Sequence, residues 1–171
     1  HDTMYLNQAM QNNINTLKSF GHILIGPGHG KLADDTVGAG RLVDERVLLQ
    51  VLESHFAPKD LTGRRVLVTA GRTEEPLDPV RYITNASSGR MGAALAADAA
   101  LRGGNVTLIH GTMDVMPPVG ITTIAVRTAA EMYTAVQKQL RGTHLIMMAA
   151  AVSDYRPKRQ AKDKLKKNRK G

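Results

Sequence analysis

Apolar and polar positions alternate with two different periods along residues 64–150. Short apolar runs, typical of buried strands, are separated by longer segments in which apolar residues recur at helical spacing. Gly103 and Gly104 stop one of these helices, and Thr128 with Glu131 three residues later forms a capping box that begins another. The pattern predicts strands at residues 65–70, 106–110, 121–126 and 144–149, and helices at about 89–102 and 129–140.

Connections of this length return each strand in the same direction, so the four strands are predicted to form a parallel sheet. We expect an α/β fold with a doubly wound, Rossmann-like sheet in which the strands lie in the spatial order 3-2-1-4. In such sheets ligands bind beyond the carboxyl ends of the strands, where the strand order reverses. Because that point lies between the first and fourth strands, residues 71–89 and 149–157 are predicted to line one crevice.

The first 53 residues carry too few apolar segments for a hydrophobic core of their own. Apolar residues at helical spacing, among them Met10, Ile14 and Leu17, begin this unit, which we interpret as the end of a larger domain. The predicted elements are a helix at 3–18, a strand at 22–25, a glycine-rich loop from 26 to 41 and a helix at 44–53, followed by a linker at 54–63 that contains Pro, Gly and mixed charge.

Composition narrows the class of protein. The 171 residues include no cysteine, which excludes a disulfide framework and a thiol nucleophile and is typical of a cytoplasmic protein. The longest apolar run, at residues 145–152, is too short to span a membrane. The net charge of +8 is local: residues 156–171 hold nine of the 23 Lys and Arg residues and one of the 15 Asp and Glu residues. This basic segment would suit a polyphosphate or another polyanion.

The crevice residues after the first strand favour an anion. Ser87-Ser88-Gly89 begins a predicted helix, and its backbone N–H groups would either be capped by a serine or cradle a phosphate. Upstream, Asn85 offers an amide for a carbonyl or carboxylate, and Arg81 offers a guanidinium that could hold a phosphate through two hydrogen bonds.

The segment after the fourth strand favours a nucleotide. Residues 149–152 carry only small side chains, so a planar base could lie along the backbone, and Asp154 follows in a position for a ribose hydroxyl or Mg²⁺. Lys164 to Lys167 would stabilise phosphate charge. The chain lacks the G-x-G-x-x-G fingerprint of a dinucleotide site, the P-loop pattern and histidines at metal-ligand spacing, so a nicotinamide dehydrogenase and a His-based zinc site are disfavoured.

Three motifs resemble one enzyme family. The segment D-x-x-R-x-I-x-N-x-S-S-G-x-M-G is present in full from Asp78 to Gly92, and AAAVSDYRP and KLKK follow at residues 149–157 and 164–167. Together they resemble phosphopantothenoylcysteine synthetase (phosphopantothenate–cysteine ligase), the coenzyme A biosynthesis domain often fused behind a flavin-dependent phosphopantothenoylcysteine decarboxylase. The resemblance assigns residues 1–53 to the end of the decarboxylase module and 64–171 to the first part of the synthetase domain.

The resemblance implies a two-step ligation. The carboxylate of 4′-phosphopantothenate would attack the α-phosphate of CTP, and cysteine would displace the nucleotide from the acyl-nucleotidylate, with Mg²⁺ accompanying the triphosphate. Asn85 would hold the activated acyl group, Arg81 would support that step, and Lys164 would act in the second. The implied nucleotide-binding residues are Gly71, Thr73, Ser87, Ser88, Gly89, Met91, Ala149, Ala150, Asp154, Lys164 and Lys167, with Asp154 also a candidate Mg²⁺ ligand.

The first unit departs from the decarboxylase pattern. His1 stands where that family has Asn, with Met4 in the same motif, and Asp34 occupies the position of the catalytic Cys in the substrate-recognition flap. Reference pKa values of about 3.9 for Asp and 8.5 for Cys mean that a carboxylate cannot replace a thiol as proton donor. The module therefore either protonates its intermediate differently or no longer decarboxylates. FMN would bind to a front half that we expect to precede His1, and further strands are expected beyond Gly171.

The resemblance also implies a cytoplasmic homo-oligomer whose partners are 4′-phosphopantothenate, cysteine and CTP, without a membrane or nucleic acid. Two other interpretations stay open. The basic C-terminal segment would let a non-catalytic protein bind nucleic acid or another polyanion, with strong salt dependence and no preference for a base. Alternatively, the first unit alone would serve as part of a flavin-binding scaffold.

Overall fold

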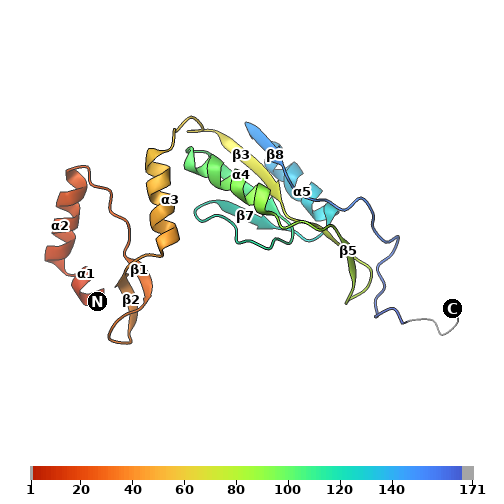
Figure 1. The fold of residues 1–171 in the computed structure, drawn as a ribbon, viewed down its shortest axis with the longest axis horizontal. Helices are drawn as coiled ribbons and strands as arrows, with labels where there is room; N and C mark the ends of the chain where they lie inside the picture. Colours follow the sequence, from red (N-terminus) through yellow and green to blue (C-terminus); the bar gives the residue numbers. More distant parts are fainter. Residues whose placement is uncertain (1, 167–171) are drawn as a thin grey trace. The chain divides into compact units, whose positions relative to one another are not determined.

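The computed structural model describes residues 2–166, and the chain divides between Phe56 and Ala57 into two compact units (Figure 1). The second unit contains the predicted sheet. Its strands lie in the order β7-β6-β3-β8 and all pair in parallel, so the predicted 3-2-1-4 order and the α/β class are confirmed. The strands are β3 (Arg65–Ala70), β6 (Asn105–His110), β7 (Thr122–Ala125) and β8 (Leu145–Met148).

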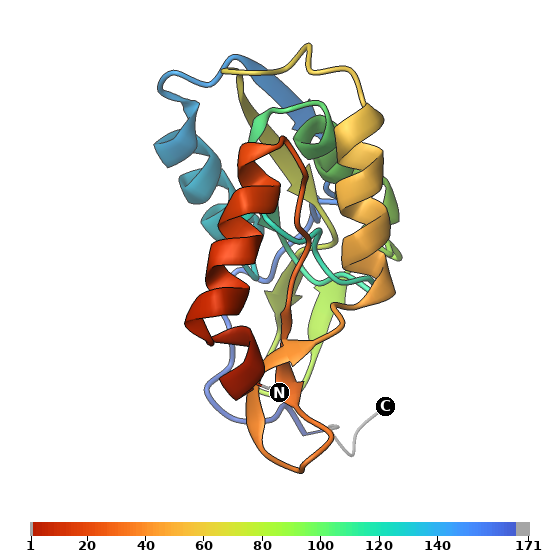
Figure 2. The same cartoon turned by 90° about the vertical axis from the view of Figure 1, so that its left-hand side faces the viewer.

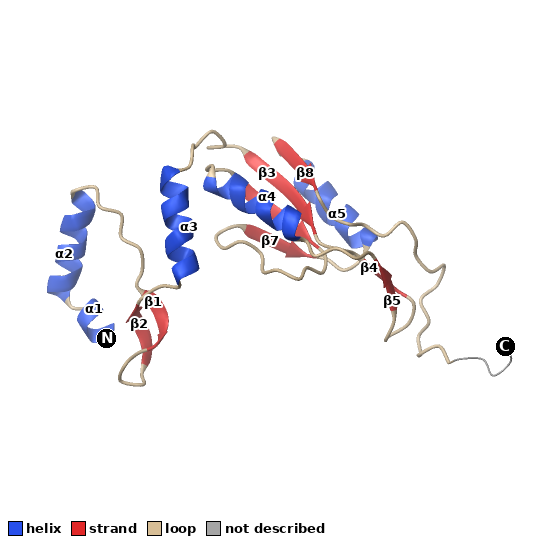
Figure 3. Ribbon diagram, viewed as in Figure 1, coloured by secondary structure: helices blue, strands red, loops and turns tan. Residues whose placement is uncertain are grey.

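One helix covers each face of this sheet (Figure 3). The helix α4 (Arg90–Leu101) places Ala96 and Ala99 against a buried cluster that includes Val68 and Leu108. On the other face, α5 (Ala129–Leu140) packs Met132 against Leu67 and Ile109. Because neighbouring side chains on a strand point to opposite faces, β3 supplies both clusters and is buried from Val66 to Ala70.

The two helices begin differently. The predicted capping box of α5 is present: the Thr128 hydroxyl accepts from the Glu131 N–H, and the Glu131 carboxylate accepts from the Thr128 N–H. The first residue before α4 is Gly89 in the left-handed conformation (φ 74°), and no side chain caps that helix. The serine N-cap considered from the sequence is therefore wrong, because the chain turns into α4 through a conformation that favours glycine.

The polar loop after β3 contains a hairpin that the sequence pattern did not predict. Its strands, β4 (Glu74–Pro76) and β5 (Tyr82–Thr84), pair antiparallel around the turn at residues 77–81. Each strand has only three residues, and all of β5 is exposed. Neither strand therefore shows an alternation of apolar and polar residues long enough to predict a strand.

The first unit differs more from its predicted elements. The expected helix is two helices, α1 (Asp2–Tyr5) and α2 (Gln8–Ser19), because Asn7 caps a new helix by accepting from the Ala9 N–H. Residues 22–25 form no strand but run in extended form beside α2 (Figure 2). The expected loop is instead a hairpin of β1 (Gly28–Lys31) and β2 (Val37–Arg41), and α3 (Glu45–Phe56) takes up residues 54–56 of the expected linker.

None of the residues in α1, α2 and α3 is buried. Large apolar side chains such as Leu17, Phe20 and Phe56 are exposed, which agrees with the expectation that this unit has no core of its own. Residues 59–62, in contrast, fold against the end of α4: the Asp60 carboxylate pairs with Arg102, and the Leu61 N–H donates to the Arg102 carbonyl. Within residues 2–166, no helix has the length and apolarity needed to cross a membrane.

Candidate nucleotide site at the carboxyl edge of the sheet

The segments that follow β3 and β8 continue their parallel pairing beyond the regular strands. The Ala151 N–H donates to the Gly71 carbonyl over 2.7 Å, and the Thr73 N–H donates to the Ala151 carbonyl over 3.3 Å. Ala149 and Ala150 are held in the same way, by the carbonyl and the hydroxyl of Thr69. The structure thus brings together, at the point where the strand order reverses, the two segments that the topology predicted to meet.

Asn85 joins the rest of the polar loop to this edge. Its side-chain N–H group donates to the Val152 carbonyl over 3.1 Å, across 67 residues of sequence, and the residue is half-buried. Asp154 lies two residues beyond Val152 and is exposed. Asn85 and Asp154 therefore belong to one rim, with the amide fixed against the backbone and the carboxylate open to solvent.

Thr73 was predicted to bind the nucleotide, but in the structure its side chain holds two segments of the chain together. The residue is fully buried, its hydroxyl accepts from the Ser153 N–H over 2.9 Å, and its carbonyl accepts from the Thr84 hydroxyl over 2.7 Å. Its side chain thus has no surface for a ligand and instead ties the β4–β5 hairpin to the segment after β8.

We expect the Thr73→Val substitution to destabilise the protein by about 1–3 kcal/mol, because the near-isosteric side chain leaves the Ser153 N–H without its acceptor. Thermal or urea unfolding of the variant measures the loss. Thr123→Val, on the exposed strand β7, is the matched control and is expected to stay close to the unchanged protein. Equal stability of both variants would show that the Thr73 hydroxyl contributes nothing.

The start of α4 lies at the same edge of the sheet. The Ser87 hydroxyl accepts from the Gly89 N–H over 3.4 Å, and the Ser88 carbonyl accepts from the Asp114 N–H, so neither serine side chain caps the helix. The first N–H groups of an uncapped helix attract anions, helped by the helix dipole. Met91, in the first turn, is exposed.

Arg72 is a residue of this edge that sequence reasoning missed. Its backbone pairs with Thr112 on one side and Ala151 on the other, and its guanidinium donates to the Ser87 carbonyl and pairs with Asp114 at 2.9 Å. It therefore links β3 with the loops after β6 and β8 and with the start of α4. A single arginine after a Gly gives no sequence signal for so many backbone contacts.

Two glutamates hold the β4–β5 hairpin against the neighbouring loops. Glu74 accepts from the Thr112 hydroxyl and lies 3.3 Å from the Arg127 Nε. Glu75 is buried, and its carboxylate accepts from the Ala129 N–H at the start of α5. A carboxylate beside the N-terminus of a helix is stabilised by the helix dipole, so Glu75 of β4 fixes the hairpin to α5.

Arg81 is not free to hold a phosphate through two hydrogen bonds, as the sequence suggested. Its Nε and Nη2 donate to the Asp78 carboxylate at 2.9 and 2.6 Å, and Nη2 also donates to the Leu165 carbonyl. The Asp78 side chain is completely buried, and these hydrogen bonds, with further ones from the backbone, hold its pKa far below its usual range. Asp78 begins the motif noted in the sequence, but its carboxylate was assigned no role there.

The Asp78 carboxylate should make stability depend on pH in acid. Its folded-state pKa lies below its unfolded value of about 3.9, so its contribution is complete above that pH and is lost as the pH falls further. We expect the midpoint of thermal unfolding to fall as the pH drops from about 4 to about 2, and to fall less steeply in Asp78→Asn. Parallel curves for the two proteins would show that Asp78 is not the responsible group.

The remaining predicted residues lie in other segments of the chain. Lys164 is exposed in the segment after residue 157, while His1 and Lys167 lie outside the described residues. Met4 is exposed in α1. Asp34 lies at the turn of the β1–β2 hairpin, where the Thr36 hydroxyl donates to it over 2.7 Å and lowers its pKa. A carboxylate that ionises more readily is a still poorer substitute for a thiol acid.

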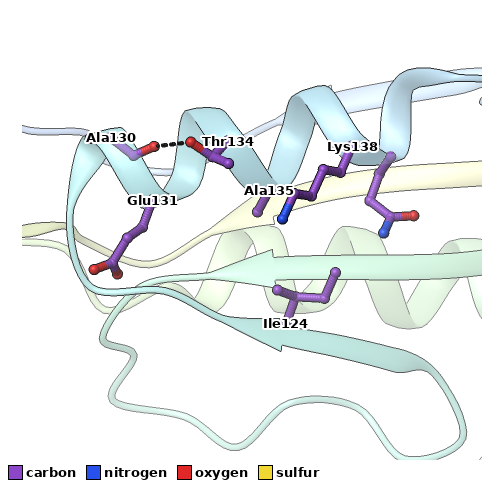
Figure 4. Close-up of a pocket in the computed structure, with 7 residues that line it drawn as sticks. Ile124, Ala130, Glu131, Thr134, Ala135 and Lys138 are labelled. Atoms are coloured by element: carbon purple, nitrogen blue, oxygen red, sulfur yellow. Dashed lines mark hydrogen bonds between the residues drawn. The ribbon is translucent and has the colours of Figure 1, made fainter.

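The described residues form no metal-binding cluster, and the groove beside α5 lies away from the predicted nucleotide residues. Among residues 2–166, no three His, Asp or Glu side chains group as ligands for a metal ion. A groove of about 390 Å³ lies between α5 and β7 and is lined by residues such as Ile124, Glu131 and Lys138 (Figure 4). It shares no residue with the predicted nucleotide site.

A parallel sheet with an uncapped helix start, a small-residue segment and a fixed amide at its reversal point is the arrangement of a doubly wound, Rossmann-like α/β domain. The chain belongs to the family described as "DNA/pantothenate metabolism flavoprotein C-terminal domain", whose model matches residues 61–171.

Curated relatives share the name "Coenzyme A biosynthesis bifunctional protein CoaBC". The chain is 48% identical over 166 residues to that of Vibrio cholerae, covering 97% of this chain and 42% of the relative. It is 42% identical over 165 residues to that of Escherichia coli, covering 96% and 41%. The chain thus spans about two-fifths of the length of these relatives.

Solved structures show the same fold. The crystal structure of the C-terminal domain of CoaBC superimposes with a TM-score of 0.57 at 43% identity, covering 60% of this chain and 52% of that one. The DNA/pantothenate metabolism flavoprotein from Streptococcus pneumoniae gives a TM-score of 0.53 at 28% identity, covering 56% and 42%.

Proposed function

We propose that this chain carries the nucleotide-binding part of a phosphopantothenate–cysteine ligase that acts in coenzyme A biosynthesis. The observation that carries the proposal is the hydrogen bond from Asn85 to the Val152 carbonyl, which joins two distant segments at the reversal point of the sheet. The names of the curated relatives support the pathway. The uncapped start of α4 and the small residues 149–151 supply groups suited to a triphosphate and a base.

The proposed reaction has two balanced steps. A carboxylate oxygen of 4′-phosphopantothenate attacks the α-phosphorus of CTP, an O–P bond forms, and the bond to pyrophosphate breaks. The amine nitrogen of cysteine then attacks the acyl carbon, CMP leaves with the C–O bond electrons, and the amine loses a proton. Asn85 holds the acyl group, the N–H groups after Gly89 receive phosphate, Asp154 meets the ribose, and Lys164 acts in the second step.

The described residues fit a metal that arrives with its nucleotide. They offer the exposed carboxylate of Asp154 but no cluster of three ligands, so Mg²⁺ would be held mainly by the triphosphate of CTP. They do not fit FMN by themselves, because residues 2–56 bury no side chain of their helices and so do not enclose a flavin ring. FMN would belong to the decarboxylase module as a whole, and Asp34 leaves the activity of that module in question.

Nucleotide binding separates this proposal from a polyanion-binding protein. We expect a fluorescent CTP analogue to bind the full natural gene product and to be displaced by CTP but not by duplex DNA. Displacement by DNA, with an affinity that falls steeply as salt rises, would favour a role of the basic segment in binding any polyanion.

We also propose that the full natural gene product is a homo-oligomer, and sedimentation of the same material would test this.

A further inference from the structure

Residues 158–166, the described part of the basic segment, form no helix or strand, yet they are fastened to the turn of the β4–β5 hairpin. The Ala161 N–H donates to the Leu77 carbonyl over 2.9 Å. Leu165 is held at both of its backbone groups: its N–H donates to the Asp78 carboxylate over 3.1 Å, and its carbonyl accepts from Arg81 Nη2 over 2.8 Å. These contacts span more than 80 residues of sequence.

Asp78 is fully occupied by these contacts. Its Oδ1 accepts from the N–H groups of Val80 and Arg81, both at 2.8 Å, and its Oδ2 accepts from the Arg81 side chain and the Leu165 N–H. A carboxylate offers about four lone-pair positions. Because all of them are used and the side chain is buried, Asp78 has no capacity left to bind substrate or metal. Its chemistry is limited to holding other parts of the chain.

We propose that Asp78 and Arg81 form a clasp that holds the basic segment against the turn of the β4–β5 hairpin, so that both are positioning residues and not substrate ligands. The clasp consists of these two side chains and Leu165. Lys164 and Lys166 flank Leu165, and Asn85 follows β5 on the same hairpin. The clasp thus sets where the Lys164 ammonium lies relative to the Asn85 amide. This role rests on the proposed function, since the lysines need a triphosphate to act on.

Charge and burial both favour a clasp over a freely solvated run of lysines. An exposed ion pair alone contributes little, but here the carboxylate is buried and the guanidinium is half-exposed and shared between the Asp78 carboxylate and the Leu165 carbonyl. Breaking the pair would release the segment as well as the charge. A misplaced cationic group near the reacting atoms costs about 10- to 100-fold in rate.

Two measurements on the full natural gene product test the clasp. In Asp78→Asn we expect trypsin to cleave after Lys162 and Lys164 at least about 10 times faster than in the unchanged protein, because the segment is released. In a double-mutant cycle on the rate of ligation, we expect Asp78→Asn to cause no further loss once Lys164→Ala is present, since both act through one cation. Asp60→Asn, which breaks another Asp–Arg pair, is the matched control and should change neither.

Unchanged cleavage in Asp78→Asn, or additive losses with Lys164→Ala, would overturn the clasp. If Asp78→Asn does not fold, Arg81→Gln replaces it, because Arg81 is half-exposed and its loss leaves the hairpin strands intact. The cleavage rate needs no nucleotide, so faster cleavage in a protein that fails to bind CTP would refute the proposed function while the fastening itself stands. Normal CTP binding with unchanged cleavage would refute the clasp alone.

Discussion

Asn85→Asp is expected to lower the rate of pyrophosphate release from CTP by at least about 100-fold, the effect of removing one preorganised hydrogen-bond donor from an active site. The substitution is isosteric, but a carboxylate cannot donate to the Val152 carbonyl, which the amide reaches over 3.1 Å. It would also place a negative charge where a carboxylate and phosphates are proposed to bind. Steady-state release of pyrophosphate with 4′-phosphopantothenate and CTP measures the effect.

The matched control for this substitution is Asn105→Asp. Asn105 is exposed at the amino end of β6, on the opposite edge of the sheet, and the same change of charge there should leave the rate unaltered. Circular dichroism of both variants checks that the fold is retained. A rate in Asn85→Asp that equals that of Asn105→Asp would remove Asn85 from the site.

Gly111→Ala is expected to destabilise the protein by about 3 kcal/mol, at the upper end of ordinary overpacking costs. A Cβ at this position would lie 2.1 Å from the Arg72 carbonyl oxygen and 2.7 Å from its carbonyl carbon. These are backbone atoms, and Arg72 is paired in both directions with Thr112, so the chain cannot move aside without losing that bridge. Thermal unfolding measures the loss.

Gly30→Ala is the control for this second prediction. The added Cβ would lie 3.4 Å from the end of the flexible Arg41 side chain, and the residue is in the hairpin of the first unit. We expect its stability to change little. If Gly111→Ala unfolds at the same temperature as Gly30→Ala, the loops after β3 and β6 are not in the close contact that the structure shows.

The sheet and its helices were predictable because local sequence patterns, such as apolar runs and capping residues at fixed spacing, determine them. The apolar run from Val66 to Ala70 is buried on both faces, and the Thr128–Glu131 capping box is read directly from two residues at fixed spacing. Once these elements were assigned, connection lengths and handedness left few topologies, and the observed strand order is one of them. The meeting of the segments after β3 and β8 followed from that order.

The missed features depend on contacts between residues far apart in the chain. The β4–β5 hairpin is stabilised by the hydrogen bond from the Ala129 N–H to the Glu75 carboxylate and by the one from the Thr84 hydroxyl to the Thr73 carbonyl. Neither pair of residues is close enough in the sequence to form a local pattern. Arg81 looked like a free cation because its partners are a carboxylate three residues away and the Leu165 carbonyl 84 residues away. A single arginine, read locally, gives no sign that its hydrogen bonds are already taken.

The first unit was predicted least well for a related reason. Its apolar residues at helical spacing indicated one helix, but α1 ends at Tyr5 and Asn7 caps a second helix, α2. The run from His22 to Ile25 has the composition of a buried strand, yet it does not pair with the two-stranded β1–β2 sheet of this unit, and the described helices of the unit bury no residue that could cover it. Burial by partners outside a segment cannot be deduced from the segment.

The proposed function requires that the edge of the sheet around Asn85 and residues 149–154 bind a nucleoside triphosphate for acyl activation. The most direct test incubates the full natural gene product with α-labelled CTP and 4′-phosphopantothenate in the absence of cysteine. We predict pyrophosphate release together with a labelled acyl-cytidylate, which is converted to CMP and the amide product when cysteine is added. Release of pyrophosphate that does not require 4′-phosphopantothenate, or no release at all, would contradict it.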